Sequence, residues 1–430
     1  MMAGQVWSEG APGRGRETFQ PRAPSSEGLP PSRPQDSRTI VATQVSLFYC
    51  ENLKDVEERI GQLAQAGVNT LILRVFHNEG DRYYSFANPK CPSGVYFQTR
   101  YAPVVDDILG PVAGLAHRHG LKVFAWMTTR HANYGFEEKE GLRTFLYDFE
   151  RNTTVPARGF NLFREEVVTR LEGLYSDLAR YPIDGILFQD DLILRRNEGF
   201  SPEARQLFAQ DHGYLPDPSL FYSGVSRDDH GRIVVSYYTN RFWTWARWKN
   251  GKLLHLAGRL MNAARNVRPN LQFALNVYYE SVLDPEKGMA WYSQSLQGAR
   301  ELPFDYFSIM AYHRQMQDEL GLTMEETLSL VPRLVEDATE MAGDPLRILM
   351  KVQVVDLKDS RVLPQEETEK VLQAVAERPG IHVALVPYQP DSPISTLVRS
   401  FKRAQVRASR EGNPGGLTAM REPPPRFSPR

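Results

Sequence analysis

The chain has 430 residues, of which 41% are hydrophobic and 24% are charged, and this balance is typical of a globular protein. The formal net charge of −1 provides no field for nucleic acid or for an anionic membrane surface, so neither is expected as a partner. No apolar run approaches the ~20 residues that a membrane span requires, so no membrane span is expected.

The two ends of the chain are rich in Gly and Pro and have few periodic apolar residues. Such segments bury too little surface to offset chain entropy, so residues 1–38 and 409–430 are predicted to be disordered tails. The N-terminus shows no apolar signal-peptide core, which predicts a cytoplasmic protein unless the true start lies upstream. Cys50 and Cys91 are expected to be free thiols, because a chain with a large core does not need a disulfide.

Between these tails, short apolar stretches alternate with amphipathic segments. The apolar stretches are too short for helices and predict strands at 40–47, 70–76, 122–127, 186–188, 271–277, 304–310, 346–354 and 381–386. The amphipathic segments predict helices at 52–66, 104–119, 163–180, 202–211, 238–266, 325–341, 366–376 and 393–403. Trp245 and Trp248 share one face of a predicted helix, and core packing is the favoured interpretation for both.

A run of eight strand–helix units predicts an α/β fold, a (β/α)8 TIM-type barrel with long βα loops over residues 39–408. An open doubly wound sheet has the same local pattern and is the alternative. The barrel is favoured because the count reaches eight and because no Gly-rich nucleotide turn follows the first strand.

In a barrel, the residues that follow each strand converge on one mouth. The side chains at these positions are rich in acids and aromatic rings. They are Phe48, Tyr49, His77, Asn78, Glu79, Asp81, Thr128, Arg130, His131, Asp190, Asp191, Tyr278, Tyr279, Glu280, Asp284, Tyr312, His313, Arg314, Asp356 and Tyr388. Carbohydrate sites have this chemistry, because aromatic faces stack on sugar C–H faces and carboxylates bind hydroxyls or transfer protons.

Asp190 and Asp191 are adjacent carboxylates at the end of the fourth predicted strand, so their side chains are expected to point to roughly opposite sides. If both approach a substrate, repulsion and burial raise the pKa of one of them and leave a proton donor beside a charged partner. Glycoside cleavage requires such a donor and a negative group near the developing oxocarbenium ion. The alternative is that one Asp caps the following segment and the other is solvated.

Several short motifs occur one after another along the chain. They are GVYFQT at 94–99, APV at 102–104, VFAWM at 123–127, DGILFQDD at 184–191, NVYY at 276–279, PE at 285–286, AWY at 290–292, DY at 305–306, MAY at 310–312 and KVQ at 351–353, followed by Asp356. Over about residues 40–405, this series resembles the C-terminal glycoside hydrolase domain of PgaB-type poly-β-1,6-N-acetyl-D-glucosamine deacetylases.

The resemblance implies a barrel that hydrolyses partly de-N-acetylated poly-β-1,6-N-acetylglucosamine, a biofilm exopolysaccharide. It also implies that Asp190 and Asp191 form the acidic centre, with Trp291, Tyr312 and Lys351 in the substrate groove. The family carries a metal-dependent deacetylase domain before the barrel, whereas only the predicted tail of residues 1–38 precedes it here, so deacetylation is not expected. The family is also exported, which would place this protein in the periplasm or outside the cell if its start is truncated.

These observations predict a glycoside hydrolase acting within a hexosamine polymer, without metal or other cofactor. One of Asp190 and Asp191 would be the general acid, and Glu280 is the next carboxylate candidate. The pair suits participation by a 2-acetamido group, and it equally suits a conventional carboxylate pair completed by Glu280. The predicted substrate-binding residues are His77, Tyr278, Asp284, Trp291, Tyr312, Lys351 and Tyr388. A mouth lined by acids would complement the ammonium groups of such a polymer.

Two other functions fit the same residues. A non-catalytic polysaccharide-binding barrel would hold or guide the polymer while its acids bind amines. A hydrolase for an unrelated glycan would share the acid pair and differ in substrate.

Overall fold

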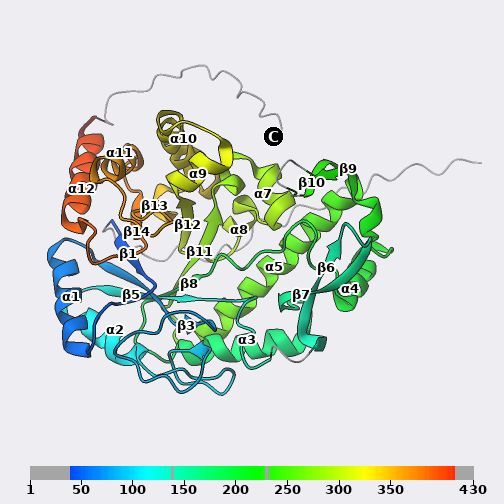
Figure 1. Cartoon of the computed structure of the whole chain (residues 1–430), viewed down its shortest axis with the longest axis horizontal. Helices are drawn as coiled ribbons and strands as arrows, with labels where there is room; N and C mark the ends of the chain where they lie inside the picture. The colour runs from blue at the N-terminus through cyan, green and yellow to red at the C-terminus, as the bar shows by residue number, and fades with distance from the viewer. Residues whose placement is uncertain (1–38, 137–139, 228–230, 232, 412–430) are drawn as a thin grey trace, which may run out of the picture. The chain divides into compact units, whose positions relative to one another are not determined.

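Eight parallel strands close into a barrel in the computed structural model, which describes residues 39–136, 140–227, 231 and 233–411 (Figure 1). In chain order the barrel strands are β1 (Val41–Val45), β2 (Thr70–Arg74), β5 (Lys122–Met127), β8 (Gly185–Phe188), β11 (Gln272–Tyr278), β12 (Tyr306–Ala311), β13 (Ile348–Gln353) and β14 (His382–Val386). Each strand pairs with the next, and β14 pairs with β1 to close the ring. The predicted (β/α)8 barrel is therefore confirmed.

Helices cover the outside of the barrel (Figure 1). Six of the longer helices connect barrel strands and one follows the last strand. The connecting helices are α1 (Leu53–Gln65), α2 (Leu109–Arg118), α3 (Glu165–Leu178), α5 (Asn240–Val267), α10 (Met324–Ala342) and α11 (Gln365–Ala376), and α12 (Ile394–Glu411) follows β14. Four shorter helices lie after β11 and β12: α6 (Glu280–Leu283), α7 (Pro285–Tyr292), α8 (Leu296–Arg300) and α9 (His313–Leu320). At the start of α10, Thr323 and Glu326 form a capping box that satisfies the first backbone N–H groups.

Two predicted helix boundaries differ from the structure by more than two residues. Helix α2 begins at Leu109 rather than at 104, because Val104 forms a β-bridge with Val95 beside the short strand β4 (Gly94–Val95). Helix α12 continues to Glu411, so residues 409–411 are helical and do not belong to a tail. The other residues of the predicted tails, 1–38 and 412–430, lie outside the part of the chain that the structure describes.

The interior of the barrel is apolar in one part and polar in another. Side chains alternate along each strand between the interior and the surrounding helices. The apolar interior cluster comprises Ile40, Ala42, Ile72, Phe124, Leu187, Ala274, Tyr306, Leu349, Ala384 and Val386. Two residues further along five of these strands the inward side is polar, at Gln44, Arg74, Asn276, Ser308 and Lys351. The polar part therefore lies toward the carboxyl ends of the strands.

Gly185 at the start of β8 is required by this interior packing. A Cβ atom at this position would lie 2.3 Å from the ring of Phe124 on the neighbouring strand β5. Because only glycine leaves room for that ring, the short strand that leads to Asp190 can pack tightly in the barrel wall.

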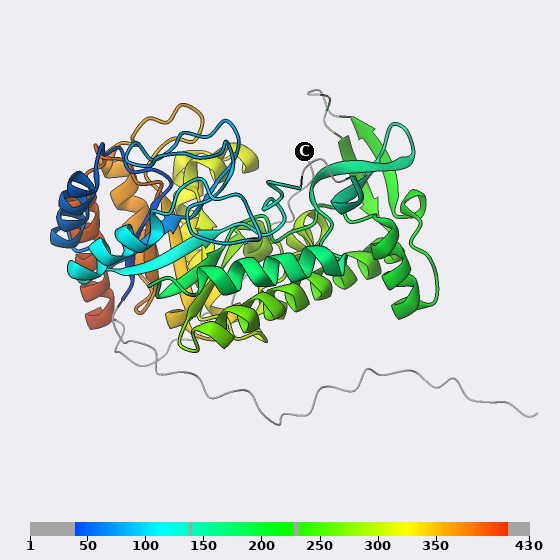
Figure 2. The ribbon, with the colours of Figure 1, turned by 90° about the horizontal axis from the view of Figure 1, so that it is seen from below.

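Long connections after β5 and β8 build an inserted lobe beside the barrel (Figure 2). The lobe contains the hairpin β6 (Arg143–Asp148) and β7 (Thr153–Phe160), helix α4 (Pro202–His212), and the hairpin β9 (Tyr222–Arg227) and β10 (Ile233–Tyr238). Its core is largely aromatic and comprises Tyr147, Phe200, Ala204, Phe208, Phe221, Phe242, Trp245, Ala246, Trp248 and Ala290. The rings of Trp245 and Trp248 stack at 4.8 Å, which confirms their predicted core packing.

Both cysteines are free, as predicted. In the described ranges, none of the helices combines the length and the apolar character needed to cross a membrane.

Candidate active site

The side chains of Asp190 and Asp191 have different surroundings, as expected from their alternation after β8. Asp191 is only 4% exposed, and its carboxylate accepts hydrogen bonds from the N–H of Thr129 at 3.0 Å, the hydroxyl of Thr129 at 2.8 Å and the N–H of His131 at 2.8 Å. These contacts tie the end of β8 to the loop that follows β5. Asp191 therefore holds the neighbouring loop, and its oxygens are already engaged.

Asp190 is half-buried, and its carboxyl interacts electrostatically with Lys351 of the polar interior. Burial raises the pKa of its carboxyl; the Lys351 ammonium opposes the rise, while the negative charge of Asp191 adds to it. The hydroxyl of Tyr278, from the end of β11, lies 3.4 Å from the backbone oxygen of Asp190. A carboxyl that retains its proton more readily than usual, and that is still partly exposed, is suited to donate that proton.

Lys351 of β13 is a buried cation that interacts electrostatically with this carboxyl. It is 1% exposed, its Nζ donates to Asn276 Oδ1 at 3.2 Å, and Nζ lies 5.7 Å from the centroid of the Tyr312 ring. Burial lowers the pKa of Lys351 to about 8, although the negative charge of Asp190 acts in the opposite direction. Lys351 is thus positioned to stabilise Asp190 whenever the carboxyl is ionised.

Glu280, the third predicted carboxylate, is enclosed by tyrosines. It is 3% exposed, and its Oε1 accepts a hydrogen bond from the hydroxyl of Tyr292 at 3.0 Å. Tyr292 in turn stacks on Tyr278, with 4.0 Å between the ring centroids. Burial, with a smaller contribution from the Glu319 charge, raises the pKa of Glu280 and favours its neutral form. The stacked tyrosines connect Glu280 to the neighbourhood of Asp190, but Glu280 itself is not accessible.

The other predicted substrate-binding residues are dispersed. His77 is fully buried, stacks on Tyr83 and shares a hydrogen bond of 2.9 Å with Tyr96, and Tyr388 is buried against Phe48. Asp284 is exposed and caps α7, with Oδ1 accepting the N–H of Lys287 at 3.0 Å.

Trp291 is the most exposed aromatic residue among the predicted substrate-binding residues. It is 36% exposed on α7, with Lys287 Nζ 4.2 Å from its ring centroid. The structure therefore groups Tyr278, Tyr312 and Lys351 around Asp190, whereas His77 and Tyr388 belong to the core.

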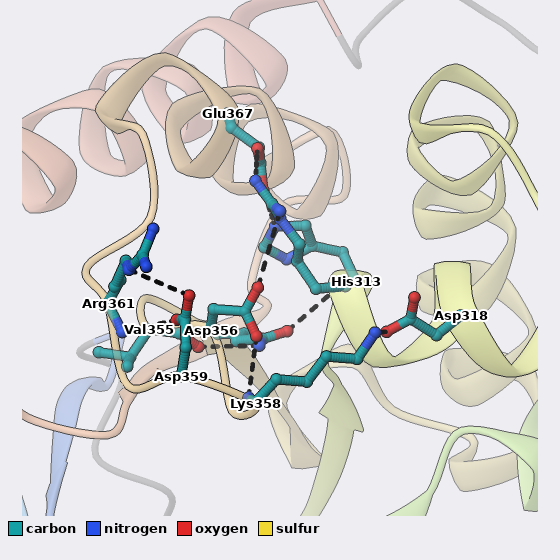
Figure 3. A network of polar contacts seen from close by, with 10 residues as sticks. His313, Asp318, Val355, Asp356, Lys358, Asp359, Arg361 and Glu367 are labelled. Carbon is teal, nitrogen blue, oxygen red and sulfur yellow. Dashed lines mark hydrogen bonds and ion pairs between the residues drawn. The ribbon is translucent and has the colours of Figure 1, made fainter.

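Some acidic side chains around the mouth are paired with basic ones. Figure 3 shows one such network after β13, where Glu367 accepts from His313 at 2.9 Å and from Arg314 at 2.7 and 2.8 Å. Arg314 also lies 3.7 Å from Asp356, and Asp81 is paired with Arg74 at 3.0 Å. These pairs neutralise part of the acidic lining expected from the sequence.

The loop that carries Asp190 and Asp191 continues into residues anchored by the long helix α5. Lys249 is fully buried there, and its Nζ donates to the carbonyl oxygens of Arg195 at 2.8 Å and Glu198 at 3.1 Å. The carboxylate of Glu198 also pairs with Arg130 from the loop after β5. The loops after β5 and β8 are therefore fixed both to each other and to α5.

Sequence reasoning missed the polar side chains inside the barrel. Apart from Lys351, which the family resemblance implies, the predicted site residues follow the strand ends, whereas Gln44, Asn276 and Ser308 lie within strands. The available signal was a polar residue in step with the inward apolar positions, as in Ala42 followed by Gln44 and Ala274 followed by Asn276.

No group of three or more His, Cys, Asp or Glu side chains suited to hold a metal ion occurs within the residues that the structure describes.

Comparison with known proteins adds a family and a fold. The model of the hypothetical glycosyl hydrolase family 13 matches residues 49–385. The PgaB (BpsB) glycoside hydrolase domain from Bordetella bronchiseptica superposes with a TM-score of 0.63 at 19% identity, over 86% of this chain and 98% of that domain. This similarity confirms the resemblance that the sequence motifs indicate.

Two other solved structures show the same fold. The catalytic domain of β-amylase from Paenibacillus polymyxa has a TM-score of 0.54 at 11% identity, over 86% of this chain and 98% of that one. A β-galactosidase from Marinomonas ef1 has a TM-score of 0.55 at 11% identity, over 87% of this chain and 59% of that one. No curated protein matches the sequence. At these identities, the structural matches establish the barrel alone.

Proposed function

Because the chain belongs to the hypothetical glycosyl hydrolase family 13, we propose that it hydrolyses glycosidic bonds within a hexosamine polymer, with Asp190 as the general acid. The favoured substrate is partly de-N-acetylated poly-β-1,6-N-acetyl-D-glucosamine, in line with the motifs shared with the PgaB family. The observation that carries the proposal is the half-buried Asp190 carboxyl, with its raised pKa, beside the buried cation Lys351.

Asp190 is the best placed of the three candidate carboxyls. The oxygens of Asp191 are engaged with Thr129 and His131, and Glu280 is buried against Tyr292. Only Asp190 combines partial exposure with a raised pKa at the end of a barrel strand. We therefore assign Asp191 a positioning role and not proton transfer.

The proposed reaction balances with one carboxyl and one water. The Asp190 proton moves to the glycosidic oxygen as the bond from that oxygen to C1 breaks. The Asp190 carboxylate left by this transfer is the negative group near the oxocarbenium ion, until water forms the new bond to C1 and gives a proton back to that carboxylate. Between these steps the Asp190 carboxylate is stabilised by the Lys351 ammonium, which is held against Asn276.

Trp291 is proposed as a stacking surface for a sugar ring. Its exposed indole lies on α7, which follows directly from β11 and α6. Aromatic faces bind sugar C–H groups, and Lys287 over the ring fixes the local geometry.

One feature supports a second candidate function, a polysaccharide-binding barrel without turnover. Two of the three candidate carboxyls, Asp191 and Glu280, are more than nine-tenths buried and do not form an open pair with Asp190. A binding barrel needs only the accessible groups, namely Asp190 and Trp291.

The two functions are separated by incubating the purified full chain with partly de-N-acetylated poly-β-1,6-N-acetylglucosamine and measuring products by mass spectrometry. Hydrolysis gives shorter oligomers, with one water added for each glycosidic bond cleaved, and these should be absent with Asp190→Asn. Retention of intact polymer on the protein, with no shorter products under any tested pH, would instead establish the binding function.

A further inference from the structure

Helix α12 has a basic face that is exposed to solvent. Its opposite face, with Leu397, Val398 and Phe401, is buried in the main hydrophobic core. The charged residues of α12 before Glu411, its last residue, are all basic, and all are exposed: Arg399, Lys402, Arg403, Arg407 and Arg410. The formal net charge of −1 is an average over the whole chain, and it conceals this local concentration of positive charge.

The spacing of these residues places them along one side of the helix. Arg399, Arg403 and Arg410 are four and seven residues apart, so they form a row of about 16 Å on one side. Lys402 and Arg407 flank the row. The helix dipole also favours cations at this end, but its effect is confined to the last turn and accounts for Arg410 alone.

The elements around α12 do not cancel this charge. Arg399 donates to an uncharged partner, Thr396 Oγ1, at 3.3 Å. Figure 1 shows α12 beside α1 and α11; the last turn of α1 has no charged residue, and the acidic residues of α11 lie in its first half. Just after α11, Glu377 is followed by Arg378, so these two charges offset each other. The basic row therefore stays positive toward its carboxyl-terminal end.

The carboxyl-terminal half of α12 lies at the end of the barrel opposite the candidate active site. Lys402 Nζ donates to the backbone oxygen of Gly67, three residues before β2, at 2.9 Å, and Gln405 donates to that of Ile381, directly before β14, at 2.6 Å. Both contacts are at the amino ends of barrel strands, whereas Asp190 follows the carboxyl end of β8. A partner bound to this half of α12 would leave the mouth open.

The composition and shape of this face indicate the kind of partner. Arginine predominates, and its guanidinium binds phosphate oxygens in a bidentate manner. Because α12 lies between α1 and α11 on the barrel wall, it cannot enter the major groove of duplex DNA, which is about 12 Å wide. Phe401, the only aromatic residue of α12, is buried and cannot stack on the bases of a single strand. A bilayer of anionic phospholipids offers phosphate groups on a flat surface and attracts clusters of Lys and Arg.

We propose that the exposed face of α12 binds the surface of an anionic phospholipid bilayer. Arg399, Arg403 and Arg410 bind the phosphate groups, and Val406, which is 53% exposed between Arg403 and Arg410, adds an apolar contact. The net charge of the chain did not predict this partner, because an average does not show where charges gather. The inference is independent of the proposed hydrolysis, since it uses no residue of the candidate active site.

Sedimentation with lipid vesicles tests this surface in the full chain. Vesicles of equal parts phosphatidylcholine and phosphatidylserine should bind the protein, and vesicles of phosphatidylcholine alone should not. Binding should fall with added salt, which screens exposed charges. Each basic residue near an anionic surface strengthens binding about five-fold, so Arg403→Gln with Arg410→Gln should weaken binding about 25-fold. Arg403→Lys with Arg410→Lys keeps both charges and should bind within about five-fold of the wild type.

Arg82→Gln with Lys90→Gln is the matched control. Both residues are exposed in the connection between β3 (Phe76–His77) and β4, and the pair lowers the net charge by the same amount. It should change vesicle binding by less than about two-fold, because charges far from the bilayer are screened. All of these side chains are exposed, so melting temperatures should stay within a few degrees of the wild type.

Several results would overturn the proposal. They are equal binding to both kinds of vesicle, no binding to either, and equal losses in the glutamine variants of α12 and of the control. Equal losses in the glutamine and lysine variants of α12 would also overturn it, because charge would not be the cause. Duplex DNA is the competing probe. If it binds more tightly than the anionic vesicles and the same α12 variants weaken it, the face is a nucleic-acid site and the lipid proposal is wrong.

Discussion

The barrel and the inserted lobe bury different kinds of side chain. The barrel interior has an apolar cluster overlaid by polar residues such as Gln44, Asn276 and Lys351, whereas the core of the lobe is dominated by aromatic rings. Lys351 is a buried cation that interacts with Asp190, and removing its charge from water costs free energy. The aromatic lobe instead buries large apolar surfaces.

This difference separates chemistry from support. The lobe contributes stability, and through Lys249 of α5 it anchors the loop that follows Asp190 and Asp191. The barrel mouth contributes the groups that meet substrate. Substitutions at the mouth should therefore change turnover more than folding, and substitutions in the lobe should do the reverse.

The largest expected effect is on turnover in Asp190→Asn. The amide is nearly the same size as the carboxyl but cannot supply a proton, and general acid catalysis contributes about 10²–10⁴-fold. We expect kcat on the polymer to fall by about this factor, while the melting temperature stays within a few degrees. Asp284→Asn is the control, because Asp284 caps an exposed helix and lies outside the Asp190 group. Wild-type turnover in Asp190→Asn would remove Asp190 as the acid.

Trp245→Ala should produce the converse result in the lobe. Trp245 is fully buried, and truncating a buried aromatic residue typically costs about 3–5 kcal/mol. Chemical denaturation should show a loss of this size, with kcat per folded molecule changed by less than about ten-fold. Trp243→Ala on the same helix is the control and should cost less, since Trp243 is only partly buried. If Trp245→Ala instead abolished turnover in folded protein, the separation of roles would be wrong.

The barrel was predictable because its strands and helices have strong local periodicity, and the fourth strand was identified from Ile186, Leu187 and Phe188 alone. The lobe was not, because its core joins segments that are distant in sequence, such as those of Phe200 and Trp245, whose rings stack. No local pattern indicates that these rings meet.

The candidate site was predicted only in part, for a similar reason. The sequence identified Asp190 and Asp191, but it could not show which carboxylate already accepts hydrogen bonds. The donors to Asp191 are Thr129 and His131, which lie in the loop after β5. It also placed His77 and Tyr388 at the mouth, where position after a strand suggested exposure, whereas both are buried in the structure.

Asp191→Ala should lower the free energy of unfolding more than Asp190→Asn does. Its carboxylate accepts from two backbone N–H groups and one hydroxyl, and hydrogen bonds to a charged group each contribute about 1.5–3 kcal/mol. Partial relaxation of the loop should limit the measured loss of unfolding free energy to about 2–3 kcal/mol. Asp284→Ala, which removes an exposed helix cap, should cost about 1 kcal/mol. Equal losses in the two variants would show that Asp191 has no special role in holding the loop.

The smallest expected effect concerns the network after β13. Burial alone would raise the pKa of Glu367, but the hydrogen bonds from His313 and Arg314 outweigh burial and lower the pKa from its ordinary value of 4.5 to about 2. A carboxyl whose pKa is lower in the folded chain stabilises the fold above pH 4.5, and that stabilisation is lost as the pH falls toward 2. Glu367→Gln should therefore cost unfolding free energy at pH 7 and progressively less below pH 4.5.

The size of this effect follows from solvent screening. Glu367 is only partly buried, and exposed ion pairs contribute about 0.2–1 kcal/mol, so the difference at pH 7 should be close to 1 kcal/mol. Melting temperatures of wild type and Glu367→Gln, measured from pH 7 down to pH 2.5, should converge. Glu366→Gln is the matched control, because Glu366 is the exposed neighbour on α11, and its curve should run close to that of the wild type throughout. Parallel wild-type and Glu367→Gln curves at all pH values would mean that the network after β13 contributes through packing and not through the charge of Glu367.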